Sequence, residues 1–110
     1  MLVNELISKF DFHDSNVIAL HHKENNLVIK LDLCMWKQKN YNEGDDELKE
    51  VFIEFTNVEK YVWDSEKAEE DIDYETILDF SYDGKSVKIV FGDEDICIMD
   101  FECSWVEFVD

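Results

Sequence analysis

The chain has 110 residues and a formal net charge of -18, because 28 Asp and Glu residues outweigh ten basic residues, all of them Lys. Carboxylates in such excess repel a phosphate backbone, and without Arg the chain lacks the bidentate donors that grip phosphate, so we expect no nucleic-acid binding. Hydrophobic residues make up 45% of the chain, a content that predicts one folded acidic domain spanning residues 1–110.

The location of the protein follows from the N-terminus and the cysteines. The first twelve residues, MLVNELISKFDF, lack the basic start and apolar run of a signal peptide. No window approaches the ~20 apolar residues of a membrane span, and the excess of carboxylates disfavours anionic lipid. The three cysteines are odd in number and have no CxxC spacing, as is typical of a reducing compartment. We therefore expect a cytoplasmic protein that does not bind membranes; its oligomeric state is left open.

The first element in chain order is a short helix. Leu2, Leu6, Ile7 and Phe10 recur at helical spacing, which predicts an amphipathic helix that docks on a sheet. After the stretch FDFHDS the period changes to two, and the strand over residues 27–35 places Leu and Ile residues in the core and Cys34 on the outer face.

Turn residues predict the register of three strand pairs. An Asn25–Asn26 turn sets Ile18 opposite Leu33, Leu20 opposite Leu31, and His22 opposite Ile29. An Asp83–Gly84 turn sets Phe80 opposite Val87, Leu78 opposite Ile89, and Asp79 opposite Lys88. A three-residue loop over Asp93–Asp95 sets Phe91 opposite Cys97, Ile89 opposite Met99, and Val87 opposite Phe101. This last register leaves Lys88 between Asp79 and Asp100.

The pattern as a whole predicts an α+β, mainly β fold. We expect about six mostly antiparallel strands in a meander-like sheet or half-barrel, with the short helix at the N-terminus. One strand presents Val51, Ile53 and Phe55 inward. The acidic stretch 64–75 is expected to be exposed and to hold a short helix begun by Asp64 or Ser65.

His13, Asp14 and Ser15 are the candidate catalytic residues. The pair of His13 and Asp14 is similar to the HD dyad of metal-dependent phosphohydrolases, which would require further ligands from an all-helical scaffold. A Ser–His–Asp triad of three adjacent residues would project its side chains in different directions. We favour a structural junction in which Phe10 and Phe12 anchor the helix to the sheet and the side chain of Asp14 or Ser15 binds backbone amides at the start of the strand.

Other chemistry has little support in the sequence. Cys97 and Cys103 are predicted on the core face, where burial suppresses thiol reactivity. His22 is expected in the core or at its rim and His21 in solvent. No calcium loop or glycine-rich phosphate loop is present in the sequence. We therefore predict no catalytic residue, no metal site and no cofactor.

The acidic segments and the aromatic residues beside them suggest a surface for a basic protein. A dense field of negative charge speeds association with a cationic partner, and aromatic residues are common anchors in interfaces. The predicted contact residues are Asp64, Glu66, Glu69, Glu70, Asp71, Asp73, Trp36, Tyr41 and Trp63.

The stretch FDFHDSNVIALHHKENNLVIKLDLCMW resembles the opening of small bacterial families that begin with an "FHDS" or "HD" junction followed by two strands. Some of these families are grouped with immunity proteins of polymorphic toxin systems. The resemblance covers Phe10 to about Trp36 and implies a non-enzymatic protein that caps a toxin domain.

Our first hypothesis is thus an acidic, non-enzymatic immunity protein that neutralises a basic toxin or another cationic protein. The alternatives are a metal-dependent hydrolase that uses His13 and Asp14, and a housekeeping domain whose carboxylates only keep it in solution.

Overall fold

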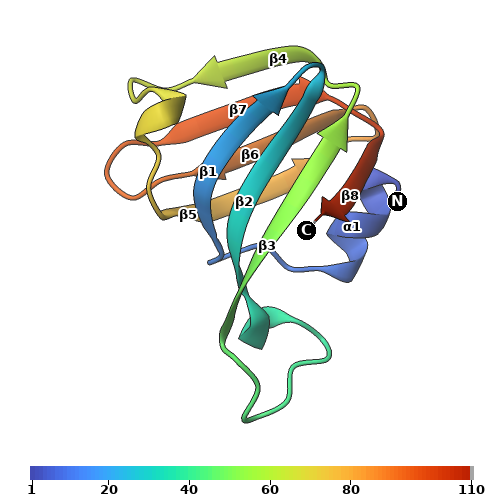
Figure 1. The fold of residues 1–110 in the computed structure, drawn as a ribbon, viewed down its shortest axis with the longest axis vertical. Coiled ribbons are helices and arrows are strands. Elements are labelled where there is room, and N and C mark those ends of the chain that lie inside the picture. Colours follow the sequence, from blue (N-terminus) through green and yellow to red (C-terminus); the bar gives the residue numbers. More distant parts are fainter. Residues whose placement is uncertain (110) are drawn as a thin grey trace.

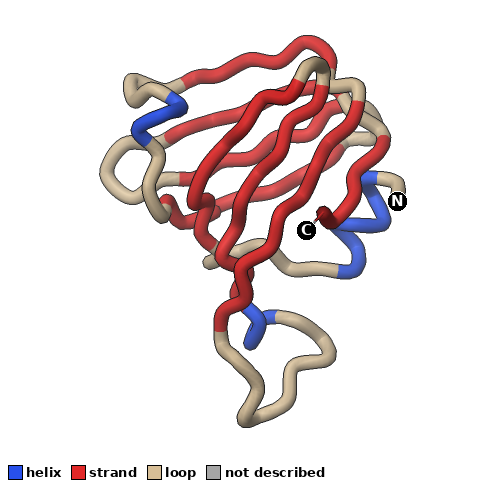
Figure 2. Tube along the Cα trace, viewed as in Figure 1, coloured by secondary structure: helices blue, strands red, loops and turns tan. Residues whose placement is uncertain are grey.

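The computed structural model describes residues 1–109, which form one α-helix, eight strands and two single-turn 3-10 helices (Figures 1 and 2). In chain order the elements are α1 (Val3–Lys9), β1 (Asn16–Lys23), β2 (Asn26–Cys34), η1 (Met35–Lys37), β3 (Leu48–Thr56), β4 (Glu59–Asp64), η2 (Glu69–Asp71), β5 (Glu75–Tyr82), β6 (Ser86–Phe91), β7 (Cys97–Glu102) and β8 (Trp105–Val109). No helix within residues 1–109 is both long enough and apolar enough to span a membrane.

The described strands form one open antiparallel sheet in the order β4-β7-β6-β5-β1-β2-β3-β8. The sheet is strongly curved, so that β1, β2 and β3 face β5, β6 and β7 across the core (Figure 1). The predicted mainly β, antiparallel fold with an N-terminal helix is confirmed. The sheet has two strands more than expected in the described range, β4 and β8, and these two form its edges.

The core lies between the two halves of the curved sheet. Ile53 and Phe55 of β3 are fully buried, as predicted, and Val51 is half-buried. The ring of Phe55 meets that of Phe101 on β7 edge-on, with 5.0 Å between centroids. Phe55 therefore connects strands that are far apart in the order of the sheet.

The register of β1 and β2 differs from the prediction by two residues. His22 lies opposite Leu27 and Leu20 opposite Ile29, because the turn is formed by residues 24–25. Asn26 belongs to the strand instead. Its side-chain Nδ2 donates a hydrogen bond to a carboxylate oxygen of Glu54 on β3, at 2.7 Å. A shift of two residues leaves Leu20 and His22 on the predicted face of the strand.

A β-bulge near the start of β1 changes which residue is buried there. The register shifts between Val17 and Ala19, so Val17 is fully buried and Ile18 is only half-buried. The prediction that Ile18 faces Leu33 was wrong, because a bulge inserts one residue and exchanges the two faces beyond it. Cys34, expected on the outer face, is buried as well.

The turn between β5 and β6 is centred one residue later than predicted. Asp83 Oδ1 accepts hydrogen bonds from the amides of Lys85, at 2.9 Å, and Ser86, at 2.7 Å. Gly84 takes the first central position with φ 99°, where a hairpin turn of type II′ places glycine.

The strand pairs follow this turn. Phe80 lies opposite Ile89, Asp79 lies opposite Val90, and the register shifts between Ile77 and Asp79. The predicted pairs of Phe80 with Val87, Leu78 with Ile89 and Asp79 with Lys88 were therefore wrong. Lys88 lies opposite Ser81 and Asp100, so its predicted position beside Asp100 is confirmed.

The register of β6 and β7 is confirmed at all three predicted pairs, which are Phe91 with Cys97, Ile89 with Met99, and Val87 with Phe101. Gly92 begins the connecting loop with φ 135°, and a Cβ atom there would lie 2.2 Å from the carbonyl oxygen of Asp95. The loop closes in this way only with glycine at position 92.

Replacing Asp83 by alanine is expected to destabilise the fold at neutral pH and to have little effect in acid. The hydrogen bonds from Ser86 and Lys85 lower the pKa of Asp83 below its ordinary value of 3.8. This carboxylate therefore stabilises the fold above the unfolded-state pKa, and its contribution is lost as the pH falls through the lower folded-state pKa. Urea unfolding across pH 2–7 measures the difference between the two proteins.

Asp83→Asn is the matched variant for this test, because the amide oxygen still accepts both hydrogen bonds but does not titrate. It is expected to keep more stability than Asp83→Ala at pH 7. A constant difference between wild type and Asp83→Ala at all pH values would contradict the assignment.

Candidate functional site

The FDFHDS stretch joins α1 to β1 and packs through its aromatic residues. Phe12 is buried and stacks on Phe80, with 4.7 Å between ring centroids. Phe10 meets Phe108 of β8 edge-on at 5.0 Å. Together they attach the junction to β5 and β8, the two strands that α1 also contacts. This agrees with the structural interpretation of the stretch.

Ser15 forms the buried hydrogen bonds of the junction. It is fully buried, and its Oγ accepts a hydrogen bond from the amide of Cys34 on β2, at 2.8 Å. Its carbonyl accepts from the amide of Ile77 on β5, at 2.7 Å. Ser15 thus connects β1 to both neighbouring strands where the sheet begins, and its hydroxyl is used as a structural acceptor.

His13 and Asp14 lie outside this buried layer. Asp14 adopts a left-handed backbone conformation with φ 69°. Its carboxylate lies 3.3 Å from His13 Nδ1 and 3.4 Å from Lys37 Nζ. Both side chains are substantially exposed, so the group is a surface cluster with one acidic and two basic members.

A shallow cleft of about 400 Å³ adjoins His13. Its charged lining includes Lys9, Lys37 and Lys39, together with Asp11 and Asp79. In residues 1–109 no group of three or more His, Cys, Asp or Glu side chains is placed to hold a metal ion.

The three cysteines, at positions 34, 97 and 103, are buried and free. Burial raises the pKa of the Cys34 and Cys103 thiols, which lowers the fraction of reactive thiolate. Cys103 Sγ also lies 3.1 Å from the carbonyl oxygen of Thr56. The prediction that Cys97 and Cys103 face the core is confirmed.

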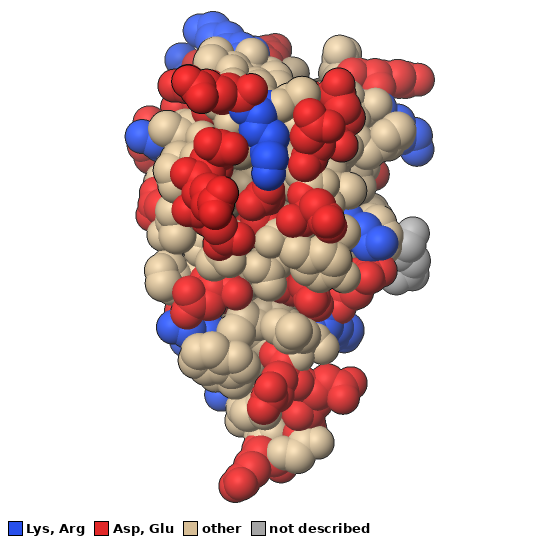
Figure 3. All heavy atoms as spheres, turned by 90° about the vertical axis from the view of Figure 1, so that its left-hand side faces the viewer, with Lys and Arg blue, Asp and Glu red and all other residues tan. Residues whose placement is uncertain are grey.

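Acidic side chains gather on one side of the molecule, around η2 and the β6–β7 loop (Figure 3). We call this surface the acidic face and define it by nine carboxylates: Asp64, Glu66, Glu69, Glu70, Asp71, Asp73, Asp93, Glu94 and Asp95. All except Glu69 are exposed, and Glu69 is half-buried.

The segments of the acidic face lie next to one another although they are far apart in sequence. Ser65 Oγ lies 3.2 Å from Cys97 Sγ, at the end of the β6–β7 loop. Lys67 is the one lysine between residues 61 and 84, and it forms an ion pair with Glu75, which raises the pKa of Lys67. The lysine is thus neutralised by a carboxylate outside the set of nine.

Several contacts hold the acidic segment 64–75 against the sheet. Glu69 accepts a hydrogen bond from the Tyr61 hydroxyl and lies 3.1 Å from His22 Nε2. Burial and this contact with Glu69 raise the pKa of Tyr61, so the phenol stays protonated as a donor. Ile72 is buried beneath the segment. The short helix predicted here is η2, but it begins after Ala68 and not at Asp64 or Ser65.

Two of the predicted contact residues have structural tasks. Glu69 is already bound to Tyr61 and His22, which places His22 at the rim of the fold. Trp63 is half-buried against Phe91, and its indole Nε1 donates to the carbonyl oxygen of Lys67, at 2.9 Å. These two residues hold the acidic segment in place through their contacts. The remaining carboxylates of the segment are exposed.

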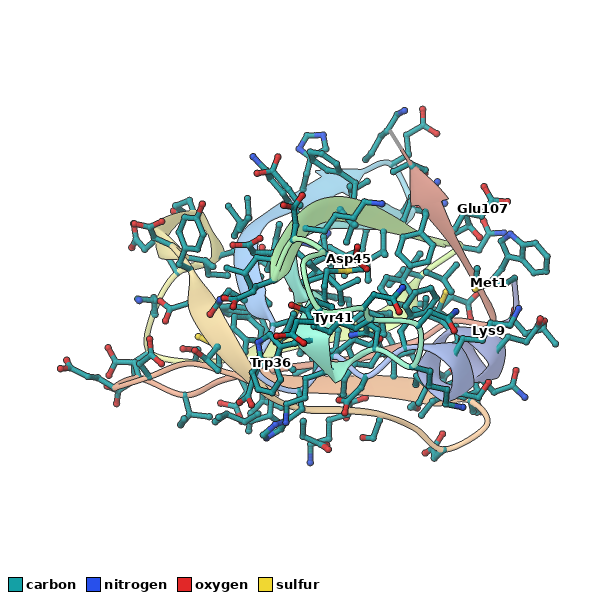
Figure 4. All side chains as sticks on the ribbon, turned by 90° about the horizontal axis from the view of Figure 1, so that it is seen from below. Met1, Lys9, Trp36, Tyr41, Asp45 and Glu107 are labelled. Atoms are coloured by element: carbon teal, nitrogen blue, oxygen red, sulfur yellow. The ribbon has the colours of Figure 1, made fainter. Side chains whose placement is uncertain are left out.

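Trp36 and Tyr41 lie elsewhere. They belong to η1 and the loop that precedes β3, which extends from the bottom of the sheet, whereas η2 lies beside its upper end (Figure 1). Figure 4 labels both residues, together with Asp45 of the loop, in the view from below. The Tyr41 hydroxyl donates to the carbonyl oxygen of Asp45, and Trp36 is 51% exposed. The predicted contact residues therefore form two separate surfaces.

No family model, curated protein or solved structure matches this chain. The candidate site is therefore judged by its own geometry, and the similarity of Phe10 to about Trp36 to bacterial immunity families stays a prediction.

Sequence reasoning missed one exposed apolar position beside the acidic face. Val62 of β4 is 56% exposed and immediately precedes Trp63 and Asp64. The alternation in EKYVWD, with Tyr61 and Trp63 half-buried between exposed residues, is the signal that indicates this strand.

Proposed function

We propose that this chain is a non-enzymatic binding protein that docks a basic protein on its acidic face. The observation that carries the proposal is the convergence of nine carboxylates from two distant segments, whose one lysine, Lys67, is paired with Glu75. Like charges repel, so a surface of this kind costs stability unless a partner or solvent compensates it.

The acidic face suits recognition because it is held in place before binding. Glu69, Trp63 and Ile72 fix the segment to the sheet through side-chain contacts. A partner then loses little entropy to ordering the loop, which leaves more of the contact energy for affinity. The carboxylates are also expected to steer a cationic partner and to raise its association rate by about 10–10³-fold at low salt.

The specific form of this function that we propose is an immunity protein in the bacterial cytoplasm. Its partner would be the basic domain of a toxin, which it neutralises by covering the surface that the toxin uses. The net charge of -18 and the FHDS-like junction are the features that support this form.

Neutralising part of the acidic face is expected to weaken capture of the partner. The test variant carries Glu66→Gln, Glu70→Gln, Asp71→Asn and Asp73→Asn, all at exposed positions. Tagged wild type and variant are used to capture proteins from the source bacterium at 50 and 500 mM salt, followed by mass spectrometry. We expect wild type to retain a basic protein at low salt and release it at high salt, and the variant to retain at least about tenfold less.

A control variant separates the position of the charge from its amount. Glu24→Gln, Glu43→Gln, Asp46→Asn and Glu47→Gln remove the same number of exposed carboxylates outside the acidic face. This control should bind the partner nearly as well as wild type. Equal losses in both variants, or no basic partner at either salt concentration, would favour carboxylates that only solvate the surface.

A further inference from the structure

The two edges of the sheet differ in how they are covered. At the β8 edge the amino group of Met1 donates to the carbonyl oxygen of Val106 at 2.9 Å, and the Val106 amide donates back to the Met1 carbonyl oxygen. Val3 donates to Ser104 in the same way. The N-terminal residues thus occupy the outward backbone groups at the start of β8, which protects this part of the edge from pairing with another chain.

The edge strand β4 has a different environment. It pairs with β7 on one side, and no backbone hydrogen bond outside that ladder reaches residues 59–64 within the described chain. Figure 1 shows β4 as the outermost strand at the top of the sheet, with its far side open. An open edge of this kind is a template for strand addition.

The hydrogen bonds of β7 determine which groups of β4 point outward. In an antiparallel ladder, successive residues direct their backbone groups alternately to the two neighbouring strands. The Cys103 amide donates to the carbonyl oxygen of Lys85, on the β6 side. By alternation, Ile98 and Asp100 present their N–H and C=O groups to β4.

The backbone groups of Val62 and Asp64 pair with those of Asp100 and Ile98, which lie opposite them. The backbone N–H and C=O of Trp63, between them, therefore point away from the sheet. A bulge near Lys60, which has φ 53°, interrupts the ladder before this point. The accessible part of the edge is the short stretch from Tyr61 to Asp64.

Side chains around this stretch indicate the chemistry of an occupant. Val62 is 56% exposed and lies between Lys60 and Asp64, which are exposed as well. Lys60 lies 3.5 Å from Glu102, which offsets its charge. Beyond Asp64 the chain enters the acidic face at once. This part of the edge thus offers one exposed apolar side chain and the outward N–H and C=O groups of Trp63. The negative charge around it increases toward the acidic face.

We propose that β4 binds an extended basic segment of the partner as an added antiparallel strand. This inference rests on the proposed function, because it specifies how the basic partner of the acidic face is held. Charge selects the occupant: a second copy of the chain would bring another -18 charges to the same edge, whereas a segment of alternating apolar and basic residues is attracted. The backbone N–H and C=O of Trp63 would form hydrogen bonds with the partner's segment, and the lysines of that segment would form ion pairs with Asp64 and Glu66.

A synthetic peptide tests the backbone pairing directly. The probe is an acetylated and amidated octapeptide of alternating valine and lysine, added to the full-length, ¹⁵N-labelled chain. We expect saturable binding and at least about tenfold slower hydrogen exchange at the Trp63 amide. The control peptide has the same side chains and charge but is N-methylated at every residue, so it cannot donate to the edge. It should bind at least about tenfold more weakly.

Two substitutions with the same change in charge complete the test. Val62→Lys places a charge on the accessible edge, whereas Leu78→Lys places one at an exposed position of the interior strand β5, which is 43% exposed. Val62→Lys should weaken peptide binding at least about tenfold, and Leu78→Lys by no more than about twofold.

Each other outcome overturns the strand-addition proposal in a distinguishable way. Equal binding of both peptides without protection of the Trp63 amide would mean that the acidic face binds by charge alone, which leaves the proposed function intact. Absence of binding by either peptide would reject the edge as a docking site, and the capture experiment would still decide the proposed function. A Trp63 amide protected in a peptide-free dimer would assign the edge to a second copy of the chain.

Discussion

Phe55→Ala is expected to lower the free energy of unfolding by about 3–5 kcal/mol, the range for removing a buried aromatic ring. Phe55 is fully buried on β3, and its ring contacts those of Phe101 on β7 and Phe80 on β5. The substitution leaves a cavity between the two halves of the curved sheet, where backbone hydrogen bonds limit how far the strands can move to fill it. Urea denaturation followed by tryptophan fluorescence measures the loss.

Val62→Ala is the matched control, since this side chain is 56% exposed on the edge strand. It should change the free energy of unfolding by less than about 0.5 kcal/mol. A loss below 1 kcal/mol for Phe55→Ala would contradict the packing of β3 against β7. Full loss of cooperative unfolding would agree with it, because the ring joins β3 to both β5 and β7.

Ser15→Ala is expected to lower the free energy of unfolding by about 1–3 kcal/mol, because it removes the only side-chain acceptor that the structure gives to the Cys34 amide in the described chain. That amide is buried, so water cannot replace the hydroxyl without rearrangement of the junction. Chemical denaturation gives the energy, and hydrogen exchange at the Cys34 amide shows whether the effect is local.

His13→Ala separates this structural role from catalysis. His13 is exposed, and its ring contacts a charged group only at Asp14 within residues 1–109, so its removal should cost less than about 0.5 kcal/mol. Binding of the basic partner should also be unchanged, because His13 is not one of the carboxylates of the acidic face. Loss of a hydrolytic activity in His13→Ala with the fold intact would instead support the metal-dependent hydrolase hypothesis.

The outcome for the candidate site shows where sequence reasoning reached its limit. The acidic segment 64–73 was found from its composition, and its exposure follows from the cost of burying charge. Trp36 and Tyr41, which were predicted as contact residues together with that segment, lie on a separate surface, because neighbours of polar segments in sequence need not share a surface. At the junction, local chemistry predicted that Asp14 or Ser15 binds backbone amides, as short polar side chains do at the start of a strand. Ser15 does so, but its partner is the amide of Cys34 on the neighbouring strand β2, which only the tertiary structure brings there.

Local patterns by themselves determined the mainly β class, the N-terminal helix, the residues of β3 that face the core, and the register of β6 and β7. These properties depend on the period of two along a strand and on the length of short loops. Both can be read from residues that are neighbours in the sequence. Only the tertiary structure decided the pairing of β1 with β5, of β3 with β8 and of β4 with β7. These pairs connect distant segments, and the chain selects them by burying both halves of the curved sheet at once. That same closure brings residues 64–73 and 93–95 together, leaves β4 at an open edge, and so creates the surface on which the proposed function depends.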